Sequence, residues 1–351
     1  MPTSSKRRAT VSRKKQHVEL VLAKDVAFRL KSTGLESVEF VHNALPELDL
    51  EDIRTDATFL GKSIALPLLV SSMTGGYPQA LRINRELASA CEEIRIPMGV
   101  GSQRQALEDS SYHRTFSVVR ETAPSIPIVG NLGAAEVARL KSADPVKRLA
   151  ELIGADGFCV HLNPLQELLQ PEGTPKFKGV LAGIEMLVRD LPLPILVKEI
   201  GAGISAEVAR RLLEVGVRHI DIAGAGGTSW AGVEILRGKH QKMHNQWWDW
   251  GIPTAEAIRA VAALKAEQGQ FTLIASGGIS SGLDIARAIA LGADIAASAR
   301  PVLKTLRKAG PRGVLSMLRA WEHDLRSVMF LTGSGTVQLL QSARILERKR
   351  P

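Results

Sequence analysis

The sequence predicts a (β/α)8 barrel (TIM barrel), a closed parallel sheet with helices outside it, preceded by an N-terminal extension. From residue 64 onward, short β-rich apolar runs alternate with segments of helical periodicity. Each run ends in small or polar residues, and the number of runs is that of a closed barrel. A doubly wound open sheet is the alternative, but it would need a Gly-x-Gly-x-x-Gly turn after an early strand, which this sequence lacks.

Eight apolar runs are the predicted strands. They cover residues 64–71, 96–100, 126–129, 157–160, 195–197, 219–222, 271–275 and 294–297. Helical segments lie between them, including 282–290 between the last two runs. We therefore expect residues 1–63 to form the extension and residues 64–351 to form the barrel domain.

A pair of glycines follows the seventh predicted strand. Gly277 and Gly278 stand between Ser276 and the helix at 282–290. Glycines let the main chain approach an anion, and a helix N-terminus behind them adds positive partial charge. The last two βα units of such barrels commonly hold a phosphate in this way. A Gly-Gly pair also occurs in ordinary turns, so this motif alone does not decide the function.

The composition limits the class of protein. With 351 residues, 45% of them hydrophobic, the chain can bury the core of one barrel-sized domain. Cys91 and Cys159 lie in apolar segments without CxxC spacing, which predicts buried thiols in a reducing cytoplasm. No run approaches the roughly 20 apolar residues of a membrane span, and no signal-peptide core follows the basic N-terminus. The formal charge of +9 is spread along the chain, so we expect phosphorylated small molecules as partners and no nucleic-acid or membrane surface.

Catalytic residues of a barrel lie at the carboxyl ends of its strands. A single Ser or Asn there often only caps a helix, but polar residues at all eight ends together favour a site. In chain order these ends are Ser71-Ser72-Met73-Thr74-Gly75-Gly76, Gly101-Ser102-Gln103-Arg104, Asn131, His161 with Asn163, Lys198-Glu199, Gly224-Ala225-Gly226-Gly227-Thr228, Ser276-Gly277-Gly278 and Ser298-Ala299.

Lys198 ends an apolar strand, so its ammonium is expected inside the mouth of the barrel. An ion pair with Glu199 is disfavoured because adjacent strand residues point to opposite faces. A buried cation suits a ligand that carries or develops negative charge. Reduced flavin is one such ligand, and the phosphate of a flavin mononucleotide would need the two phosphate loops at the last strands.

The segment from His161 to Glu167 follows the fourth predicted strand. His161 and Asn163 share one face of the strand end, and Gln166 and Glu167 come just beyond Pro164. One carboxylate beside amides and an imidazole fits a hard cation such as Mg2+ that keeps water and binds diphosphate. A solvated loop with a capping Asn is the alternative.

Several longer motifs together resemble one family over nearly the whole chain after about residue 10. They are Ser72-Met73-Thr74-Gly75-Gly76, Gly99-Val100-Gly101-Ser102-Gln103-Arg104, His161-Leu162-Asn163-Pro164-Leu165-Gln166-Glu167, Gln170-Pro171-Glu172-Gly173, Lys198-Glu199, Gly224 to Thr228, Trp250-Gly251-Ile252-Pro253-Thr254 and Met329-Phe330-Leu331-Thr332-Gly333. Arg13-Lys14 with His17, and His42-Asn43-Ala44-Leu45-Pro46-Glu47, extend the match. The chain resembles the type 2 isopentenyl diphosphate isomerases.

The resemblance implies a cytoplasmic homo-oligomer, a tetramer or octamer, that uses FMN and Mg2+ to interconvert isopentenyl and dimethylallyl diphosphate for isoprenoid synthesis. It also implies NADPH as the reductant of the flavin. Carried over by position, the implied flavin contacts are Ser72, Met73, Thr74, Ser102, Asn131, Lys198, Thr228, Gly277, Gly278, Ser298 and Ala299. The implied substrate contacts are Arg13, Lys14, Ser102, Arg104, His161 and Gln166, with Glu167 on the metal.

The residue types agree with that chemistry. Isomerisation delivers a proton to one alkene carbon and removes another from an allylic carbon. Gln166, His161 and Lys198 are the expected catalytic residues. Neither Gln166 nor Asn163 is a strong acid, which leaves N5 of reduced flavin as the proton carrier, with Lys198 balancing its charge.

Some positions depart from the family pattern. Ala223 stands where relatives can carry a hydroxyl, and Gln16 replaces a usual acidic residue. The insertion at 232–248, rich in Lys, His and Trp, is expected to be a flexible lid.

Three other functions agree less well with these residues. A flavin-dependent α-hydroxyacid oxidase would need a His base and an Arg at the sixth strand end, but Arg237, His240 and His244 lie inside the insertion. An inosine-monophosphate dehydrogenase would need a cysteine near Thr228, where none stands. A non-enzymatic basic scaffold would leave the polar strand ends unexplained.

Overall fold

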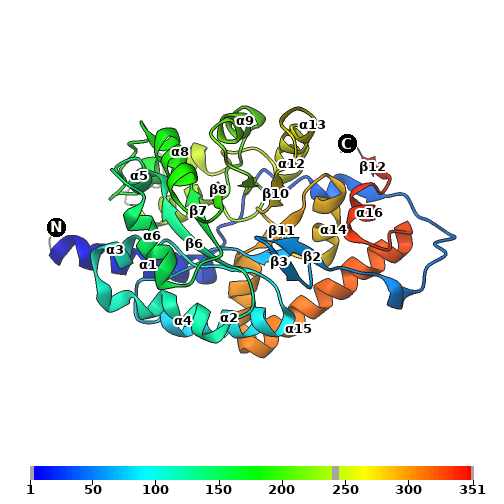
Figure 1. Ribbon diagram of the computed structural model, residues 1–351, viewed down its shortest axis with the longest axis horizontal. Coiled ribbons are helices and arrows are strands. Elements are labelled where there is room, and N and C mark those ends of the chain that lie inside the picture. The colour runs from blue at the N-terminus through cyan, green and yellow to red at the C-terminus, as the bar shows by residue number, and fades with distance from the viewer. Residues whose placement is uncertain (1–3, 239–244, 349–351) are drawn as a thin grey trace.

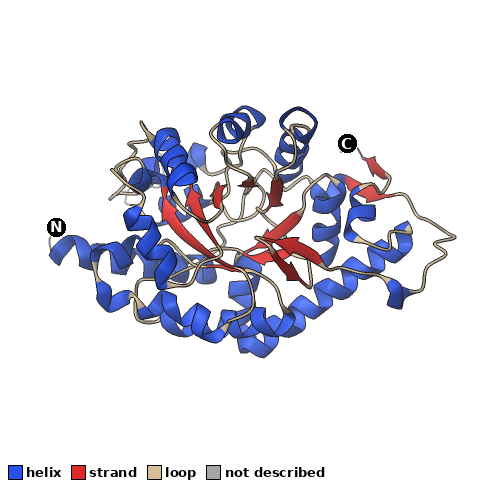
Figure 2. Cartoon of the chain, viewed as in Figure 1, coloured by secondary structure: helices blue, strands red, loops and turns tan. Residues whose placement is uncertain are grey.

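A closed barrel of eight parallel strands forms the centre of the molecule, in a computed structural model that describes residues 4–238 and 245–348 (Figures 1 and 2). Around the barrel the strand order is β10-β11-β4-β5-β6-β7-β8-β9, and the ring closes where β9 pairs with β10. The strands are β4 (Leu68–Val70), β5 (Met98–Gly99), β6 (Ile128–Gly133), β7 (Gly157–His161), β8 (Ile195–Lys198), β9 (His219–Asp221), β10 (Thr272–Ala275) and β11 (Ile295–Ser298). The predicted fold class is confirmed.

Helices surround the barrel in the described part of the chain (Figure 2). They are α2 (Ala80–Ile94), α3 (Arg104–Glu108), α4 (Arg114–Thr122), α5 (Ala134–Val137), α6 (Asp144–Leu152), α7 (Pro164–Leu169), α8 (Val180–Asp190), α9 (Ala206–Glu214), α10 (Trp230–Arg237), α12 (Thr254–Ala262), α13 (Lys265–Gln268), α14 (Gly282–Ala290), α15 (Arg300–Thr332) and α16 (Val337–Gln341). The predicted helix at 282–290 is α14, and the Ser281 hydroxyl caps its N-terminus by accepting from the N–H of Asp284.

The hydrophobic core has two parts, which follow from the alternation of side chains along a strand. One apolar set lies between the strands and the outer helices. The other fills the barrel interior and includes Leu69, Val129, Cys159, Leu196 and Ile274. These interior positions fix which later residue of each strand points into the mouth.

The first predicted strand, 64–71, begins too early. The run 64–71 does not form one strand, because Ile64 ends β3 (Lys62–Ile64) and the barrel strand β4 begins only after Pro67. Strand β3 pairs with β2 (Ala57–Phe59) in an antiparallel hairpin. Phe59 and Ile64 belong to the interior apolar cluster, and the Phe59 ring meets the ring of His219 at the start of β9 edge to face. The hairpin therefore covers the N-terminal end of the barrel.

The two ends of the chain are tied to the barrel in different ways. Near the C-terminus, β12 (Ile345–Glu347) pairs antiparallel with β1 (Val38–Phe40) of the extension. Helix α1 (Ser4–Ala23) contacts α3, α10 and α15, which follow strands at the mouth. Short 3-10 turns lie at Leu35–Ser37, Leu50–Asp52, Ser110–Tyr112 and Asn245–Trp247. The extension thus supplies a helix to the functional end of the barrel.

Both cysteines are free and buried, as predicted. Burial raises the pKa of the Cys159 thiol to about 12, so this thiol stays protonated at neutral pH. In the ranges that the structure describes, no helix is both long and apolar enough to cross a membrane.

Candidate active site

A cavity of about 580 Å3 opens at the carboxyl ends of the strands, where barrel chemistry is expected. The structure brings every site residue that the sequence predicted to the wall of this one cavity. From the barrel and its loops these are Ser72, Met73, Thr74, Ser102, Arg104, Asn131, His161, Gln166, Glu167, Lys198, Thr228, Gly277, Gly278, Ser298 and Ala299, and from α1 they are Arg13 and Lys14. Their roles toward a ligand remain predictions.

The floor of the cavity follows from strand periodicity. Val129, Cys159 and Leu196 point into the barrel interior. Two residues further along the same strands stand Asn131, His161 and Lys198, which therefore point the same way and line the cavity. The same step of two leads from Leu69 to Ser71 and from Ile274 to Ser276. The alternation that places apolar side chains inside the barrel thus also directs the polar side chains at the strand ends into the cavity.

The glycine loop after β10 is packed against the loop after β9. Gly277 has φ +100, and a Cβ there would stand 2.1 Å from the carbonyl oxygen of Gly224. The hydroxyl of Thr254 donates to the carbonyl of Gly277 at 2.6 Å, and the hydroxyl of Ser298 donates to the carbonyl of Ile279 at 2.8 Å. Within the described residues, the N–H groups of Gly277 and Gly278 donate to no protein acceptor. Two backbone donors are therefore left at the cavity wall.

Lys198 lies beside carboxylates without a close ion pair to either. Its ammonium donates to the carbonyl oxygen of Glu199 and lies 4.0 Å from the carboxylate of Asp221. The Glu199 carboxylate instead accepts from the N–H groups of Ile200, Gly201 and Ala202. The prediction that Lys198 and Glu199 do not pair is confirmed, and the ammonium is available to a ligand in the cavity.

His161 is held as a neutral imidazole. Asn131 donates through Nδ2 to the carbonyl of Val100, so its Oδ1 faces Nδ1 of His161 at 2.8 Å. An amide oxygen only accepts, which places the proton of the ring on Nδ1 and leaves Nε2 as an acceptor. Burial, together with the charges of Lys198 and Lys14, lowers the pKa of His161 to about 3. In the free site the ring is therefore neutral at neutral pH.

Gln166 is oriented by two neighbours. Its amide nitrogen donates to the carboxylate of Glu234 at 3.0 Å, and its amide oxygen accepts from Asn163 at 3.0 Å. Glu167 accepts from Asn163 at 3.2 Å and from the N–H of Thr174 at 2.7 Å. The segment is thus an ordered, hydrogen-bonded wall of the cavity rather than a solvated loop.

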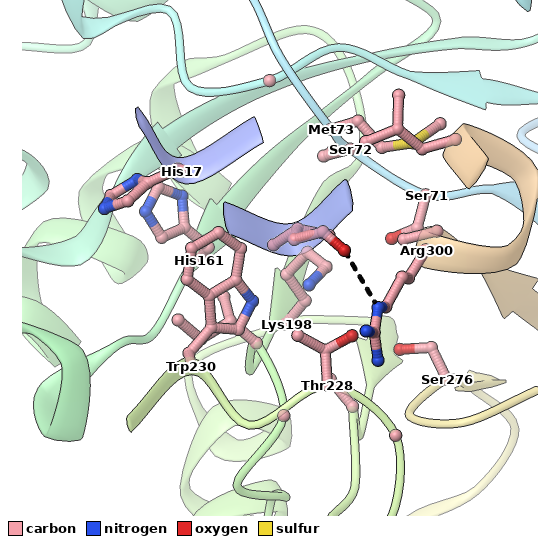
Figure 3. A pocket seen from close by; sticks show the side chains of 18 of the residues that line it. His17, Ser71, Ser72, Met73, His161, Lys198, Thr228, Trp230, Ser276 and Arg300 are labelled. Carbon is pink, nitrogen blue, oxygen red and sulfur yellow. Dashed lines mark hydrogen bonds between the residues drawn. The ribbon is translucent and has the colours of Figure 1, made fainter. Parts of the chain in front are cut away.

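Glu234 is a buried carboxylate that is not among the predicted site residues. It accepts from His17 at 2.8 Å and pairs with Arg237, besides its contact with Gln166. Burial acts to raise the pKa of Glu234, but His17 and Arg237 outweigh it and hold that pKa below its ordinary value. Glu234 therefore stays ionised and links α1 to the Gln166 side of the site. Figure 3 shows His17 of α1 on this side of the site, near Trp230 and His161.

A cluster of cations lies on the β5 and β6 side of the mouth. Lys14 donates to the carbonyl oxygens of Gly75 at 2.8 Å and Ser102 at 2.7 Å. Arg104 pairs with Glu136 at 2.8 Å and with Glu108 at 3.2 Å. Burial, followed by the charges of Arg13 and Arg104, lowers the pKa of Lys14 to about 7. We call Arg13, Lys14 and Arg104 the cation cluster.

Other cavity residues were not predicted. Glu136, Trp230 and Arg300 also line the wall. Asp221, two positions after the inward-facing His219, does not line the cavity but is buried next to it, where it accepts from the hydroxyl of the lining residue Ser276 at 2.6 Å. Applying the period of two to β9 would have identified Asp221, whereas the sequence holds no signal that singles out the partners Glu136 and Arg300.

The expectation of a flexible lid at 232–248 is wrong for the residues that the structure describes there. Helix α10 covers the first part, with Gly232 packed against the ring of the buried Trp248. His240 and His244, the candidate bases of an oxidase, lie outside the described residues. Arg237 is held by Glu234 and Glu172 and does not line the cavity.

The structure describes both residues that depart from the family pattern, Ala223 and Gln16. Ala223 lines the cavity, and the Gln16 amide oxygen accepts from Arg237 at 3.2 Å.

The chain is similar over nearly its full length to curated isopentenyl-diphosphate delta-isomerases. It is 49% identical to that of Chlorobaculum parvum, covering 97% of this chain and 98% of the relative. It is 45% identical to that of Pseudescherichia vulneris, covering 95% and 96%. The chain belongs to the isopentenyl-diphosphate delta-isomerase family. Residues 172–347 also match the model of the FMN-dependent dehydrogenase family, in agreement with the flavin-dependent type 2 branch.

Solved structures agree on the fold of this delta-isomerase family member. A lactate oxidase from Pediococcus acidilactici has a TM-score of 0.69 at 14% identity, covering 97% of this chain and 95% of that one. A mandelate oxidase with (S)-2-phenylpropionate has a TM-score of 0.67 at 18% identity, covering 98% of each chain. At these identities the likeness concerns the barrel and not the chemistry.

Lys14 provides a test of the cation cluster. With a pKa of about 7, its amine is mostly neutral near pH 8 in the free site, and a bound diphosphate would favour the ammonium. Binding should then take up close to one proton at about pH 8, and affinity should fall as the pH rises above about 7. Calorimetric titration with inorganic diphosphate in buffers of different ionisation enthalpy measures this uptake.

The Lys14→Met variant should lose this uptake, and Lys15→Met, which removes an exposed neighbour, should keep it. Equal proton uptake by the parent protein and Lys14→Met would contradict the assignment.

Proposed function

We propose that this protein interconverts isopentenyl diphosphate and dimethylallyl diphosphate with FMN bound at the barrel mouth. One observation carries the proposal: a single cavity joins the glycine loop of β10 to the cation cluster, with neutral amide and imidazole groups between them. One end suits the phosphate of a flavin, and the other suits the diphosphate of a substrate. The activity named for the full-length relatives supports this reading.

The residues present fit FMN. The N–H groups of Gly277 and Gly278 and the hydroxyl of Thr228 lie where a phosphate could accept from them. Lys198 stands on the cavity floor, where it would balance negative charge on the ring system. When bound and reduced, FMN would supply the acid-base group that isomerisation requires. NADPH is the reductant that we expect to prepare it.

The cation cluster would hold the diphosphate. Arg104 keeps its orientation through Glu136 and Glu108, and Lys14 is fixed by two carbonyl oxygens. Glu167 would hold Mg2+ together with diphosphate oxygens and water, and the ion would offset the charge of the diphosphate. The carboxylate already accepts from Asn163 and Thr174, which fixes its direction.

The apolar five-carbon tail would lie between these ends, beside His161 and Gln166. The pKa of His161, near 3, keeps the ring neutral, so Nε2 acts as a hydrogen-bond acceptor and not as an acid. Glu234 and Asn163 occupy both ends of the Gln166 amide and fix its orientation. These residues would position the alkene and shield the reacting carbons from water.

The proposed function is tested by following product and reductant together. The protein is supplied anaerobically with FMN and Mg2+, and with NADPH at a concentration far below that of the substrate. It should then convert isopentenyl diphosphate over many turnovers, because isomerisation has no net redox change. In D2O the product should carry deuterium, since a proton is exchanged in each turnover. One NADPH consumed per product, or turnover with oxidised flavin alone, would instead support an oxidase or a dehydrogenase.

The metal assignment is tested by Glu167→Gln, which keeps the size of the side chain and removes its charge. The Mg2+ concentration for half-maximal activity should rise by about tenfold or more, because Mg2+ prefers a charged oxygen ligand. Glu185→Gln on the outer helix α8 removes an exposed carboxylate and should leave the Mg2+ titration unchanged. If Glu167→Gln titrates like the parent protein, Glu167 does not bind the metal.

A further inference from the structure

Asp221 is a buried carboxylate beside the cavity to which the proposed reaction gives no role. It ends β9, between β8 and β10 in the ring of strands, and its exposed fraction is 2%. Its Oδ1 accepts from the hydroxyl of Ser276 at 2.6 Å and from the N–H of Ala223 at 3.2 Å. Within the described residues its Oδ2 has no hydrogen-bond partner. A buried carboxylate oxygen without a donor is costly and therefore requires an explanation.

The ammonium of Lys198 lies opposite this oxygen. Lys198 and Asp221 are partners in the register of β8 and β9, and Nζ lies 4.0 Å from Oδ2. Lys198 also donates to the carbonyl oxygen of Glu199, which leaves two of its three N–H groups. Burial raises the pKa of Asp221, and the charge of Lys198 is the largest of the effects that act to lower it. The ammonium is therefore the main group that favours the ionised form of this carboxylate.

The same carboxylate determines what Ser276 presents to the cavity. Ser276 lines the wall, and its hydroxyl proton is used in the hydrogen bond to Asp221. A hydroxyl has one proton, so the oxygen of Ser276 can only accept from a ligand, whereas Lys198 can only donate. Figure 3 shows both side chains at the cavity. Asp221 thus lies behind one donor and one acceptor that face the same space.

We propose that Asp221 is a positioning residue that acts through Lys198, by orienting the ammonium and cancelling part of the positive charge that a bound flavin would meet. This proposal rests on the FMN site of the proposed function. An uncompensated ammonium would strongly favour the negative charge that the ring system gains with two electrons and one proton. The same charge makes the reduced ring system a base, so excessive stabilisation would weaken its capacity to accept a proton. Asp221 limits this stabilisation and so preserves the basicity of the reduced cofactor.

The test is the reduction potential of FMN bound to Asp221→Asn, which keeps the size of the side chain and removes its charge. Without the carboxylate, the ammonium favours the anionic reduced flavin more, so the equilibrium constant for two-electron reduction should rise by about tenfold or more. That change is a rise of about 30 mV or more in the potential, measured anaerobically by equilibration with a dye of known potential. An unchanged potential overturns the proposal.

Two further variants accompany this measurement. Asp52→Asn removes an exposed carboxylate outside the cavity and should leave the potential unchanged. Asp221→Ser is also neutral and is smaller, and it takes the place of Asp221→Asn if that variant does not fold. It should raise the potential in the same direction, and an unchanged potential would again overturn the proposal.

A Lys198→Met background tests whether Asp221 acts through the ammonium. In that background the buried carboxylate has lost its main counter-charge and is protonated, so adding Asp221→Asn at saturating FMN should shift the equilibrium constant by less than about threefold. An equal shift in both backgrounds overturns the action through Lys198. The proposed function fails separately, because it requires that the parent protein bind FMN and isomerise its substrate, whatever the potential of the variants.

Discussion

The concentration of positive charge in a partly buried cavity is the physical constraint on which the rest of the site depends. Lys198, Arg104, Lys14 and Arg300 all line one barrel mouth, and backbone carbonyls hold the latter two. Removing such an ion from water costs several kcal/mol when no opposite charge compensates it. Burial, followed by the charges of Arg13 and Arg104, lowers the pKa of Lys14 in accordance with that cost. Bound anions would relieve this cost, which supports the two phosphate-bearing ligands that we propose for the cavity.

The barrel strands determine which way their terminal side chains point, and these directions could be predicted from the sequence. Lys198 and His161 follow inward apolar residues by two positions, so a correct strand assignment aims them into the mouth. The start of the first barrel strand could not be predicted in this way. The run 64–71 is apolar from Ile64 to Val70, and only the bend at Pro67 separates the hairpin from the barrel.

The residues that the sequence did not reveal are those whose role depends on tertiary partners. Helix α1 is polar along most of its length and offers no apolar stripe, yet it places His17 against Glu234. Glu136 can be recognised as a site residue only from its ion pair with Arg104, which follows a different strand and lies 2.8 Å away. The oxidases of known structure share the barrel at low identity, so the assignment of chemistry rests on the site residues and the full-length relatives and not on the fold.

We infer that the cavity holds two phosphate-bearing groups at separate ends. Thermal unfolding of the flavin-free protein with FMN, with inorganic diphosphate plus Mg2+, and with both together tests it most directly. Each ligand should raise the free energy of unfolding by mass action, and the two increments should at least add. If the combination stabilises the protein no more than the stronger ligand alone, the two compete for one anion site, and the account is contradicted.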